Sequence, residues 1–416
     1  MSGLNFLNKL LDGVDVEWLS LGELGDFIRG NGLQKKDFVE SGFPAIHYGQ
    51  IYTRYGLSAD KTFTYVLPEL ANKLRKAQKN DLLLATTSEN DEDVVKPLAW
   101  LGDNVAISGD MMLFRHEQNV KYLAYFFQSE IFQTQKMKYI TGAKVRRVSS
   151  GDLSKIKIPI PCSNNPEKSL AIQSEIVRIL DKFTALTAEL TAELNMRKKQ
   201  YNYYRDQLLS FKEGEVEWKA LGEIGEVRMC KRILKSQTSS EGEIPFYKIG
   251  TFGKEPDSYI SRKLFNEFKE KYSYPKVGEV LISASGTIGR TIIFDGRESY
   301  FQDSNIVWIE NNEKIVLNKY LFYFYKIAKW GISEGGTIKR LYNDNLRKLM
   351  IPVPFPDSPE RSLVEQQKIV KLLDKFDALT NSITEGLPRE IELRQKQYEY
   401  YRDLLFSFPK PETVSN

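Results

Sequence analysis

Few residues of this chain are suited to catalysis. The sequence holds two histidines, His47 and His116, and two cysteines, Cys162 and Cys230. Such small numbers argue against a thiolate zinc site, a site of several histidines and a disulfide framework. We expect both histidines to be core or surface residues, so the sequence predicts no catalytic residue and no metal site on this chain.

Motifs for binding a cofactor are also missing. The Gly-x-x-x-x-Gly-Lys-Ser/Thr loop that cradles phosphates does not occur in the sequence. Asn164-Asn165-Pro166 lacks the aromatic partner of an adenine methyltransferase loop, and no glycine-rich cofactor loop follows a strand upstream. The acidic residues at 91–93 have no neighbouring lysine pattern typical of a nuclease centre, which favours a solvated loop. We therefore expect no cofactor on this chain.

Basic side chains are better candidates, for binding rather than catalysis. A basic cluster follows a glycine at corresponding places in the two halves of the chain, and lysine and arginine neutralise DNA phosphates. The net charge of +4 is compatible with a nucleic-acid partner. A solvated surface cluster is the alternative interpretation. The candidate residues are Lys144, Arg146, Arg147, Lys339 and Arg340.

Two further segments carry groups that can form hydrogen bonds to DNA. Ser285-Gly-Thr-Ile-Gly-Arg290 follows an expected strand, and its glycines allow a close approach of the backbone. A plain strand-turn-strand is the alternative for this segment. The aromatic and polar stretch at 47–54 presents side chains able to contact base edges. The candidate residues are Ser285, Thr287, Arg290, Gln50, Thr53 and Arg54.

An internal duplication supplies the elements that must position these residues. Three blocks recur in the same order, and between them the two copies diverge. The plan is therefore variable, constant, variable, constant, and the chain opens with the tail end of a constant block. The recurring blocks are Val16–Asp26 with Val216–Glu226 (seven of 11 residues identical), Leu180–Thr187 with Leu373–Thr380, and Arg197–Phe211 with Arg394–Phe408 (11 of 15 identical).

The variable segments are expected to be mixed α/β. Short runs of aliphatic and β-branched residues predict strands. Tyr122–Phe127 and Tyr320–Tyr325 predict helices that cover the sheet, and Ile158–Pro161 and Ile351–Pro354 are expected to be extended segments that end each variable domain. The expected strands are 82–86, 111–114, 280–283, 291–294 and 306–309.

The constant blocks are expected to be long helices, the first over about 169–209 and so about 60 Å long. Apolar residues alternate at spacings of three and four, which predicts a coiled-coil seam between the two helices. An amphipathic helix packed on its own domain is the alternative. Gly386 and Pro388 lie in a four-residue insertion of the second helix and predict a break or kink there. The seam residues are Ile176, Ile179, Phe183, Leu186, Leu190, Ile369, Leu372, Phe376, Leu379 and Ile383.

The plan and the two constant-block motifs resemble the specificity subunit of type I restriction-modification enzymes. The Ser-Gly-Thr-Ile-Gly and Gly-x-x-x-Lys/Arg-Arg elements are similar to parts of that family's target recognition domains, although Ala85-Thr-Thr-Ser88 stands in place of Gly-Thr-Ile-Gly in the first. The resemblance implies two mixed α/β recognition domains, two long antiparallel coiled-coil helices and a pseudo-two-fold internal duplication. It implies five segments: a constant piece 1–17, recognition domain 18–157, central constant helix 158–217, recognition domain 218–350 and constant helix 351–416.

The resemblance also implies a function and partners. Each recognition domain is expected to read one half of a split double-stranded DNA target, while the helices set the gap between the halves. Two methyltransferase subunits and the restriction and translocase subunits are the expected partners. S-adenosylmethionine, ATP and magnesium are expected on those partners and not on this non-catalytic chain.

Three alternatives remain open at this level. One is a specificity subunit of a methylation-only or type II-like system, and another is a coiled-coil scaffold without a DNA role. The third is a self-contained methyltransferase, which would bind S-adenosylmethionine by itself. The N-terminus lacks the apolar core of a signal peptide, and no apolar run is long enough to span a bilayer, so a cytoplasmic location is expected.

Overall fold

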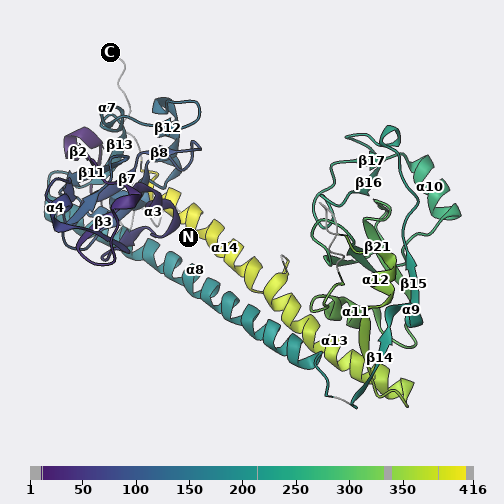
Figure 1. Ribbon diagram of the computed structural model, residues 1–416. Coiled ribbons are helices and arrows are strands. Elements are labelled where there is room, and N and C mark those ends of the chain that lie inside the picture. The colour runs from purple at the N-terminus through teal and green to yellow at the C-terminus, as the bar shows by residue number, and fades with distance from the viewer. Residues whose placement is uncertain (1–10, 12, 213, 332–339, 383, 409–416) are drawn as a thin grey trace. The chain divides into compact units, whose positions relative to one another are not determined.

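The chain divides into two compact units, and both of its ends belong to the same one. The first unit comprises residues 1–190 and 390–416, and the second comprises residues 191–389. The computed structural model describes residue 11 and residues 13–212, 214–331, 340–382 and 384–408. Each unit contains an α/β domain and parts of the long helices (Figure 1). The tail end of a constant block at the N-terminus thus shares a unit with the C-terminal helix.

Two mixed sheets form the α/β domain of the first unit. One has the strand order β2-β11-β7-β9-β4, in which β4 is parallel to β9 and the other pairs are antiparallel. The other has the order β5-β3-β10-β6, with β3 and β10 parallel. The strands of this unit are β1 (Val16–Ser20), β2 (Gly25–Arg29), β3 (Phe43–Ile46), β4 (Ser58–Ala59), β5 (Thr64–Val66), β6 (Lys76–Ala77), β7 (Leu82–Ala85), β8 (Thr87–Ser88), β9 (Lys96–Trp100), β10 (Val105–Ile107), β11 (Met111–His116), β12 (Arg146–Arg147) and β13 (Lys157–Pro161).

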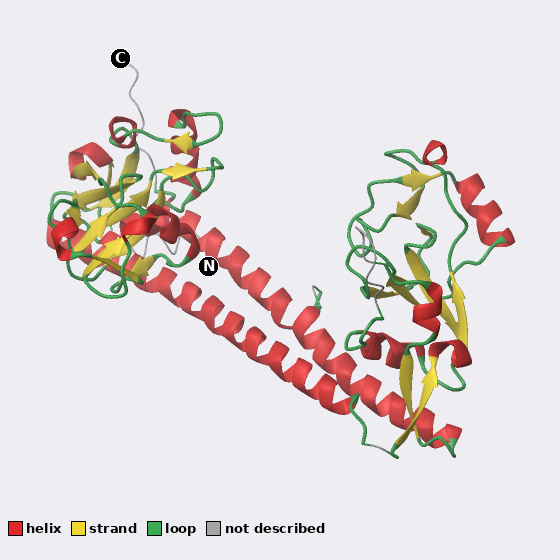
Figure 2. Ribbon diagram, in the orientation of Figure 1, coloured by secondary structure: helices red, strands yellow, loops and turns green. Residues whose placement is uncertain are grey.

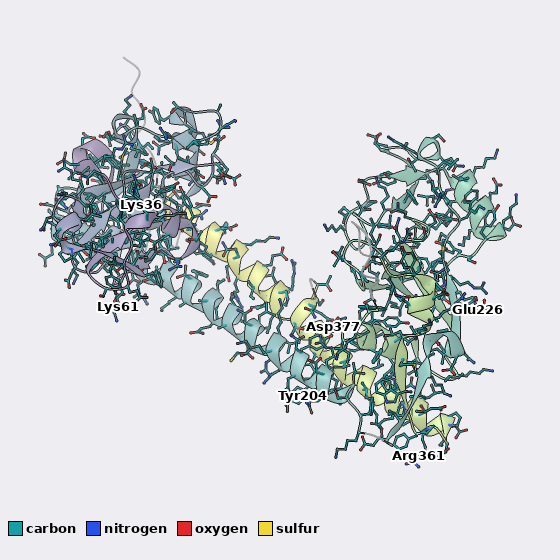
Figure 3. All side chains as sticks on the ribbon, in the orientation of Figure 1. Lys36, Lys61, Tyr204, Glu226, Arg361 and Asp377 are labelled. Atoms are coloured by element: carbon teal, nitrogen blue, oxygen red, sulfur yellow. The ribbon has the colours of Figure 1, made fainter. Side chains whose placement is uncertain are left out.

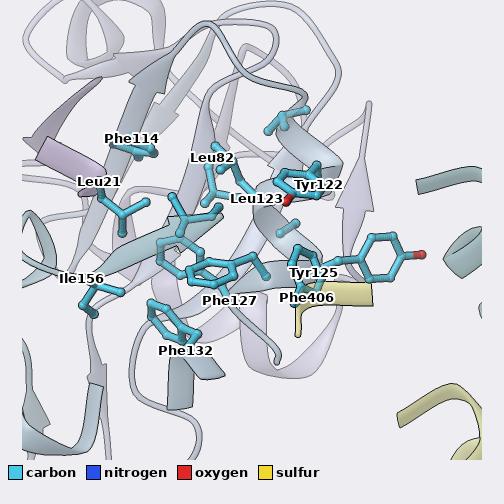
Figure 4. Close-up of a cluster of buried hydrophobic side chains, with 14 of the residues drawn as sticks. Leu21, Leu82, Phe114, Tyr122, Leu123, Tyr125, Phe127, Phe132, Ile156 and Phe406 are labelled. Atoms are coloured by element: carbon cyan, nitrogen blue, oxygen red, sulfur yellow. The ribbon is translucent and has the colours of Figure 1, made fainter. Parts of the chain in front are cut away.

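Helices cover the larger sheet of the first unit and close its core. Phe114 from the sheet, Tyr122 and Leu123 from α5, and Phe406 from α14 are fully buried in one cluster (Figure 4). The C-terminal helix therefore completes the core of a domain that begins about 400 residues earlier. The helices of this unit are α2 (Leu21–Leu24), α3 (Tyr48–Thr53), α4 (Pro68–Ala71), α5 (Val120–Phe126), α6 (Glu130–Lys136), α7 (Ser150–Leu153), the first half of α8 (Pro166–Leu208) and nearly all of α14 (Gly386–Phe406), with 3-10 turns η1 (Lys35–Asp37) and η2 (Met137–Tyr139).

The second unit repeats this design with fewer strands (Figure 2). An antiparallel sheet has the order β15-β21-β18-β19, and a second sheet has the order β17-β16-β20, with β16 and β20 parallel. Its strands are β14 (Val216–Ala220), β15 (Gly225–Arg228), β16 (Ile244–Tyr247), β17 (Tyr259–Ile260), β18 (Val280–Ser283), β19 (Thr291–Ile293), β20 (Tyr300–Phe301), β21 (Ile306–Asn311) and β22 (Met350–Pro354). Its helices are α9 (Leu221–Ile224), α10 (Arg262–Lys271), α11 (Asn318–Tyr325), α12 (Asn343–Arg347), α13 (Pro359–Asn381) and the second half of α8, with the 3-10 turn η3 (Lys235–Gln237).

A two-stranded ladder closes each domain where it meets the helices. β1 pairs with β13 so that Trp18 lies opposite Pro159, and β14 pairs with β22 so that Trp218 lies opposite Pro352. Proline has no backbone N–H to donate to a neighbouring strand, and it is tolerated in such strands because each has a partner on one side only. The Ile-Pro-x-Pro segments were expected to be extended, and they are, but each also pairs with the repeated Val-Glu-Trp block.

The long helices differ in one respect that the sequence indicated. α8 is continuous over 43 residues, whereas the second constant block is divided into α13 and α14. α13 ends at Asn381, and α14 begins at Gly386, which has a φ of +75°. A Cβ at Gly386 would lie 2.5 Å from the carbonyl oxygen of Ala378, so only glycine fits there. The predicted break is confirmed.

Most of the expected elements are present. All five expected strands are found, as β7, β11, β18, β19 and β21, and the two tyrosine-rich segments form α5 and α11. Strands β2 to β6, β8 to β10, β12, β15 to β17 and β20 were not anticipated, and they include the largely buried strand β9.

The apolar seam of the long helices is partly as expected. In the first unit Ile176 is buried and Phe183 stacks on Tyr401 of α14, with ring centroids 5.2 Å apart. In the second unit Phe376 stacks on Tyr204 of α8 at 5.5 Å (Figure 3 labels Tyr204). The seam partners are thus the tyrosines of the other constant motif. The remaining expected members are Ile369, which is buried, Ile179, Leu190 and Leu379, which are half-buried, and Ile383, which lies outside the described residues.

Two seam positions need correction. Leu186 is 38% exposed and Leu372 is 40% exposed, so neither is a buried contact. Ile176 also belongs to the same core cluster as the sheet residues of the first unit, so the helix packs on its own domain as well as on α14. Because α8 must serve both surfaces, a strict seam along one face does not form.

Candidate nucleic-acid interface

Repeated polar contacts fasten a short helix of each domain to the long helix beside it. The Asp181 carboxylate accepts a hydrogen bond from the Tyr125 hydroxyl at 2.7 Å, and Asp374 accepts one from Tyr323 at 2.6 Å. Burial and the neighbouring carboxylate raise the pKa of each tyrosine, so both remain protonated donors. The aspartate of the repeated Leu-Asp-Lys-Phe motif therefore orients α5 and α11 in the same way.

A buried glutamine makes a second repeated contact. Gln173 accepts a hydrogen bond from the backbone of Asn119 at the start of α5, and Gln366 accepts one from the backbone of Leu317 at the start of α11, both at 2.9 Å. Both side chains are completely buried. Sequence reasoning missed these glutamines, although their equal positions in the two constant blocks were a usable signal.

In the first unit, the basic segment lies beside the loop that follows β7. β12, which consists of Arg146 and Arg147, pairs antiparallel with β8. Arg147 and Lys144 are exposed, whereas Arg146 forms an ion pair with Asp91 at 2.7 Å. Two of the three predicted basic residues are therefore available to an anionic partner, and the third is already neutralised by the acidic loop.

A buried lysine, Lys136, holds the backbone of the acidic loop of the first unit through hydrogen bonds. The Nζ atom of Lys136 donates to the carbonyl oxygens of Glu92 at 2.8 Å and Val94 at 3.0 Å. The side chain is completely buried, and burial lowers the pKa of this ammonium to about 8. The Tyr52 hydroxyl donates to Thr87 O at 2.9 Å. The backbone of the loop is therefore anchored, while the side chains of Glu92 and Asp93 are exposed to solvent, as expected.

The predicted base readers of the first unit are differently placed. Gln50 is buried, accepts from the His47 backbone and donates to Thr64, so its amide is occupied inside the domain. Thr53 is exposed and its hydroxyl donates to Gly49 O, while Arg54 is exposed and lies 5.8 Å from the ring centroid of Phe63. Only the last two present side chains at the surface.

In the second unit, the corresponding loop is a tight turn between β18 and β19. The Ser283 hydroxyl accepts from the Arg290 backbone at 2.9 Å, and Arg290 donates from Nη1 to Phe252 O at 2.9 Å. Gly289 has a φ of +82°, and a Cβ there would lie 2.1 Å from Trp330 Nε1. This glycine is therefore required by packing. Thr287 is exposed, whereas Ser285 is buried and donates to Asn305.

The structure brings this turn and the second basic segment together. Ser285 and Arg340 form a backbone bridge, which corresponds to the β8–β12 pairing of the first unit. Arg340 also donates from Nη2 to Ser304 O at 3.1 Å. Lys339 lies outside the described residues. In both units, therefore, the basic segment pairs with one loop, which follows β7 in the first unit and β18 in the second.

Sequence reasoning missed a further set of residues beside Arg340. They surround a polar hollow and come from segments with no recognisable motif: Arg232, Lys235, Lys248, Gln302, Asp303 and Asn305. The sequence held no signal for this set, because its members come from separate segments that the fold brings together.

Both histidines have structural positions. His47 caps α3 by accepting from Gly49 N at 3.2 Å, and burial lowers its pKa. His116 accepts from Gln118 N at 3.1 Å, and burial lowers its pKa to about 4. Among the described residues, no helix is both long and apolar enough to cross a membrane.

Comparison with known proteins gives consistent results. Residues 13–197 and residues 213–393 each match the family model described as the type I restriction modification DNA specificity domain. A Haemophilus influenzae protein, provisionally named a type I restriction enzyme specificity subunit, is 46% identical over 97% of this chain and 98% of its own. The specificity subunit of type I restriction enzyme EcoR124I/EcoR124II from Escherichia coli is 43% identical over 100% of both chains.

Solved structures share the fold. The S subunit of a type I restriction-modification system from M. genitalium has a TM-score of 0.51 at 15% identity, over 96% of this chain and 98% of that chain. A chain from a study of complex assembly and conformational transition of the type I R-M system has a TM-score of 0.58 at 15% identity, over 94% and 97%.

Proposed function

The chain belongs to the family of type I restriction-modification specificity subunits, and we propose that each of its two units reads one half of a split DNA target. The observation that carries this proposal is a repeated frame with two unlike loops. In the first unit the loop after β7 lies beside a basic segment, where Ser88 pairs with Arg146. In the second unit the loop after β18 does the same, where Ser285 pairs with Arg340. The same backbone pairing with different side chains suits two domains that recognise different DNA sequences.

Exposed basic residues supply the sequence-independent part of binding in this proposal. Lys144 and Arg147 are exposed in the first unit and contact phosphates, which fixes the domain on the duplex. Thr53 and Arg54 in the first unit and Thr287 in the second are also exposed, and they contact base edges in the major groove. In the second unit the corresponding basic residues are Arg340 and Lys339, of which Lys339 takes the phosphate-binding role.

We assign catalysis and cofactors to partner subunits. In this proposal neither histidine serves as a catalyst, because His47 and His116 each accept an internal hydrogen bond and burial lowers the pKa of both. Two methyltransferase subunits bind S-adenosylmethionine and dock on the constant helices, one for each repeat. Restriction and translocase subunits bring ATP and magnesium. The complex works in the cytoplasm, where the DNA lies.

Mapping of modified bases tests this function. The chain is expressed with the methyltransferase subunit encoded beside it, and host DNA is read by long-read sequencing that detects methylated adenine. We expect one motif of two short defined halves separated by a fixed undefined gap. A continuous motif would contradict the two-reader model.

The control is the methyltransferase subunit expressed alone, which should leave no motif. If the assembled complex binds DNA with no dependence on salt and modifies nothing, the chain acts as a scaffold and the proposal is wrong.

A further inference from the structure

The polar hollow of the second unit is built mainly from hydrogen-bond donors. It lies between η3, the segment after β16 and the loop that joins β20 to β21. Two of its cations are paired, Arg232 with Asp303 at 2.9 Å and Lys248 with Asp257 at 2.8 Å. The remaining polar groups at its wall include Gln302, Asn305 and Arg340. None of these amides was predicted as a DNA contact.

The orientation of the Gln302 amide follows from its partner. Its Oε1 atom accepts a hydrogen bond from the backbone N–H of Ile249 at 2.9 Å. A backbone N–H can only donate, so the oxygen must face Ile249 and the NH₂ group must point the other way. Among the described residues the NH₂ group has no acceptor, which leaves two donors at the hollow.

Asn305 and Arg340 reinforce this donor character. The Asn305 oxygen accepts from the Ser285 hydroxyl at 2.7 Å, which leaves its NH₂ group on the opposite side. Arg340 is held at Ser304 O and carries donors only. Three side chains from two segments therefore present N–H groups beside one another.

The loop that carries both amides is held in a strained conformation. Ser304, between Gln302 and Asn305, has a φ of +51°, a value that few residues other than glycine adopt. Such strain concentrates at functional sites, where the surrounding structure enforces it. Here it is enforced by the hydrogen bonds from Arg340 to Ser304 O and from Ser285 to Asn305.

We propose that this hollow reads a guanine in the half-site of the second unit, with Gln302 as a specificity-determining residue. This inference rests on the proposed function. In the major groove guanine presents two acceptors, N7 and O6, and no donor, which matches a wall of donors. A phosphate is also an acceptor, and the cations of the lining outnumber its two carboxylates, which are both paired. A base contact differs from a phosphate contact in that it decides which sequence is methylated, and the test measures that choice.

The test is Gln302→Glu in the full chain, assembled with its methyltransferase subunit. The new carboxylate still accepts from Ile249 N, but it offers an acceptor to DNA where the wild type offers donors. We expect methylation of the native motif to fall by about tenfold or more, and the change to concern one guanine in one half. The preferred base there should become one that presents an amino group, cytosine or adenine.

Gln237→Glu is the matched control. Gln237 accepts from Leu234 N at 2.8 Å in the same way, lies in the same unit and is outside the hollow. It adds the same charge near the DNA, so it should weaken binding uniformly and leave the motif unchanged. Gln302→Met removes the amide at similar volume, and it should relax the choice of base at the same position; it replaces Gln302→Glu if that variant does not assemble.

The possible results separate the inference from the proposed function. Equal loss on all DNA with the motif unchanged would mean a phosphate contact, and an unaltered motif at full efficiency would mean no contact; either result overturns the inference. Both leave a wild-type motif of two halves intact. Only the absence of that motif in the wild-type complex counts against the proposed function itself.

Discussion

The loop after β7 in the first unit and the loop after β18 in the second occupy the same place and have opposite chemistry. The first is acidic, is held by the buried Lys136 and neutralises Arg146 through Asp91. The second is a glycine-rich turn packed on Trp330. The side chain of Arg340, in the basic segment that bridges to this turn, donates to a neutral carbonyl, that of Ser304.

This contrast shows which parts of the two copies remained alike and which diverged. Two kinds of contact between the domains and the long helices recur in both copies, the tyrosine–aspartate bonds and the 2.9 Å bonds of Gln173 and Gln366. The recognition loops share a backbone frame but no side-chain chemistry. A constant base with a variable reader is the arrangement expected of a chain whose target changes while its partners do not.

The largest effect is expected from a lesion in the second loop. Gly289→Ala places a Cβ 2.1 Å from Trp330 Nε1 at a φ of +82°. We expect a loss of about 3 kcal/mol in the free energy of unfolding of the second unit, from overpacking and backbone strain together. Denaturant melts followed by Trp fluorescence measure it. Gly286→Ala is the control, because its Cβ would meet Ile249 at 3.6 Å, an ordinary contact, and should cost about 1 kcal/mol. Equal losses for the two variants would show that Trp330 does not define the turn.

The constant contacts should respond alike in the two units. Gln173→Ala and Gln366→Ala each leave a backbone N–H without its acceptor, and each should cost about 2 kcal/mol of unfolding free energy. Thermal unfolding of the single and double variants measures this. Lys182→Ala and Lys375→Ala, at exposed positions of the repeated Leu-Asp-Lys-Phe motif in the same helices, should change stability by less than about 0.5 kcal/mol. Costs that differ widely between the two glutamines would break the equivalence of the constant parts.

The buried lysine gives the first loop a dependence on pH. Because its pKa is about 8 in the folded chain and 10.5 ordinarily, the unfolded chain binds more protons between these values. Stability therefore rises with pH in that window, by about 1 kcal/mol from pH 8 to pH 9. Urea melts of the wild type and of Lys136→Met should show this gain only in the wild type. Parallel pH curves for the two proteins would mean that the lysine is not desolvated.

The smallest effect concerns the salt dependence of DNA binding. Asp91→Asn removes the carboxylate that pairs with Arg146 at 2.7 Å and releases one cation for a phosphate. The slope of log K against log salt should steepen by about 0.9, which is about a threefold change in affinity ratio between 50 and 200 mM salt. Titrations of the complex with labelled duplex DNA measure it, with Asp295→Asn as control, because that carboxylate pairs with Arg297 and not with Arg146. An unchanged slope would mean that Arg146 does not face the phosphates.

The duplication made the scaffold predictable from the sequence. Repeated motifs located both long helices and the break before Gly386, because helical periodicity and a positive φ leave local signals. The strands β7 and β18 also left a local signal, because each is a short run of buried apolar residues such as Leu82–Leu84.

The details of the site were less accessible. Gln50 was a reasonable reader by residue type, but its amide is used inside the domain, a fact that depends on Thr64 14 residues away. Gln302 and Asn305 carry no motif and become neighbours of Arg340 only through the β20–β21 loop. Long-range pairing decides which polar side chains remain free, and one sequence holds no record of that.

The central claim is that each unit reads its half-site independently on a common frame. The two units offer matched graft points, because Leu21 N donates to Ile156 O and Leu221 N donates to Leu349 O, both at 2.9 Å. We would replace residues 221–349 by residues 21–156 and map methylation in the assembled complex. The account predicts a motif made of two copies of the half that the first unit reads, with the gap unchanged. A motif that still contains the original second half, or one with no relation to the first half, would contradict it.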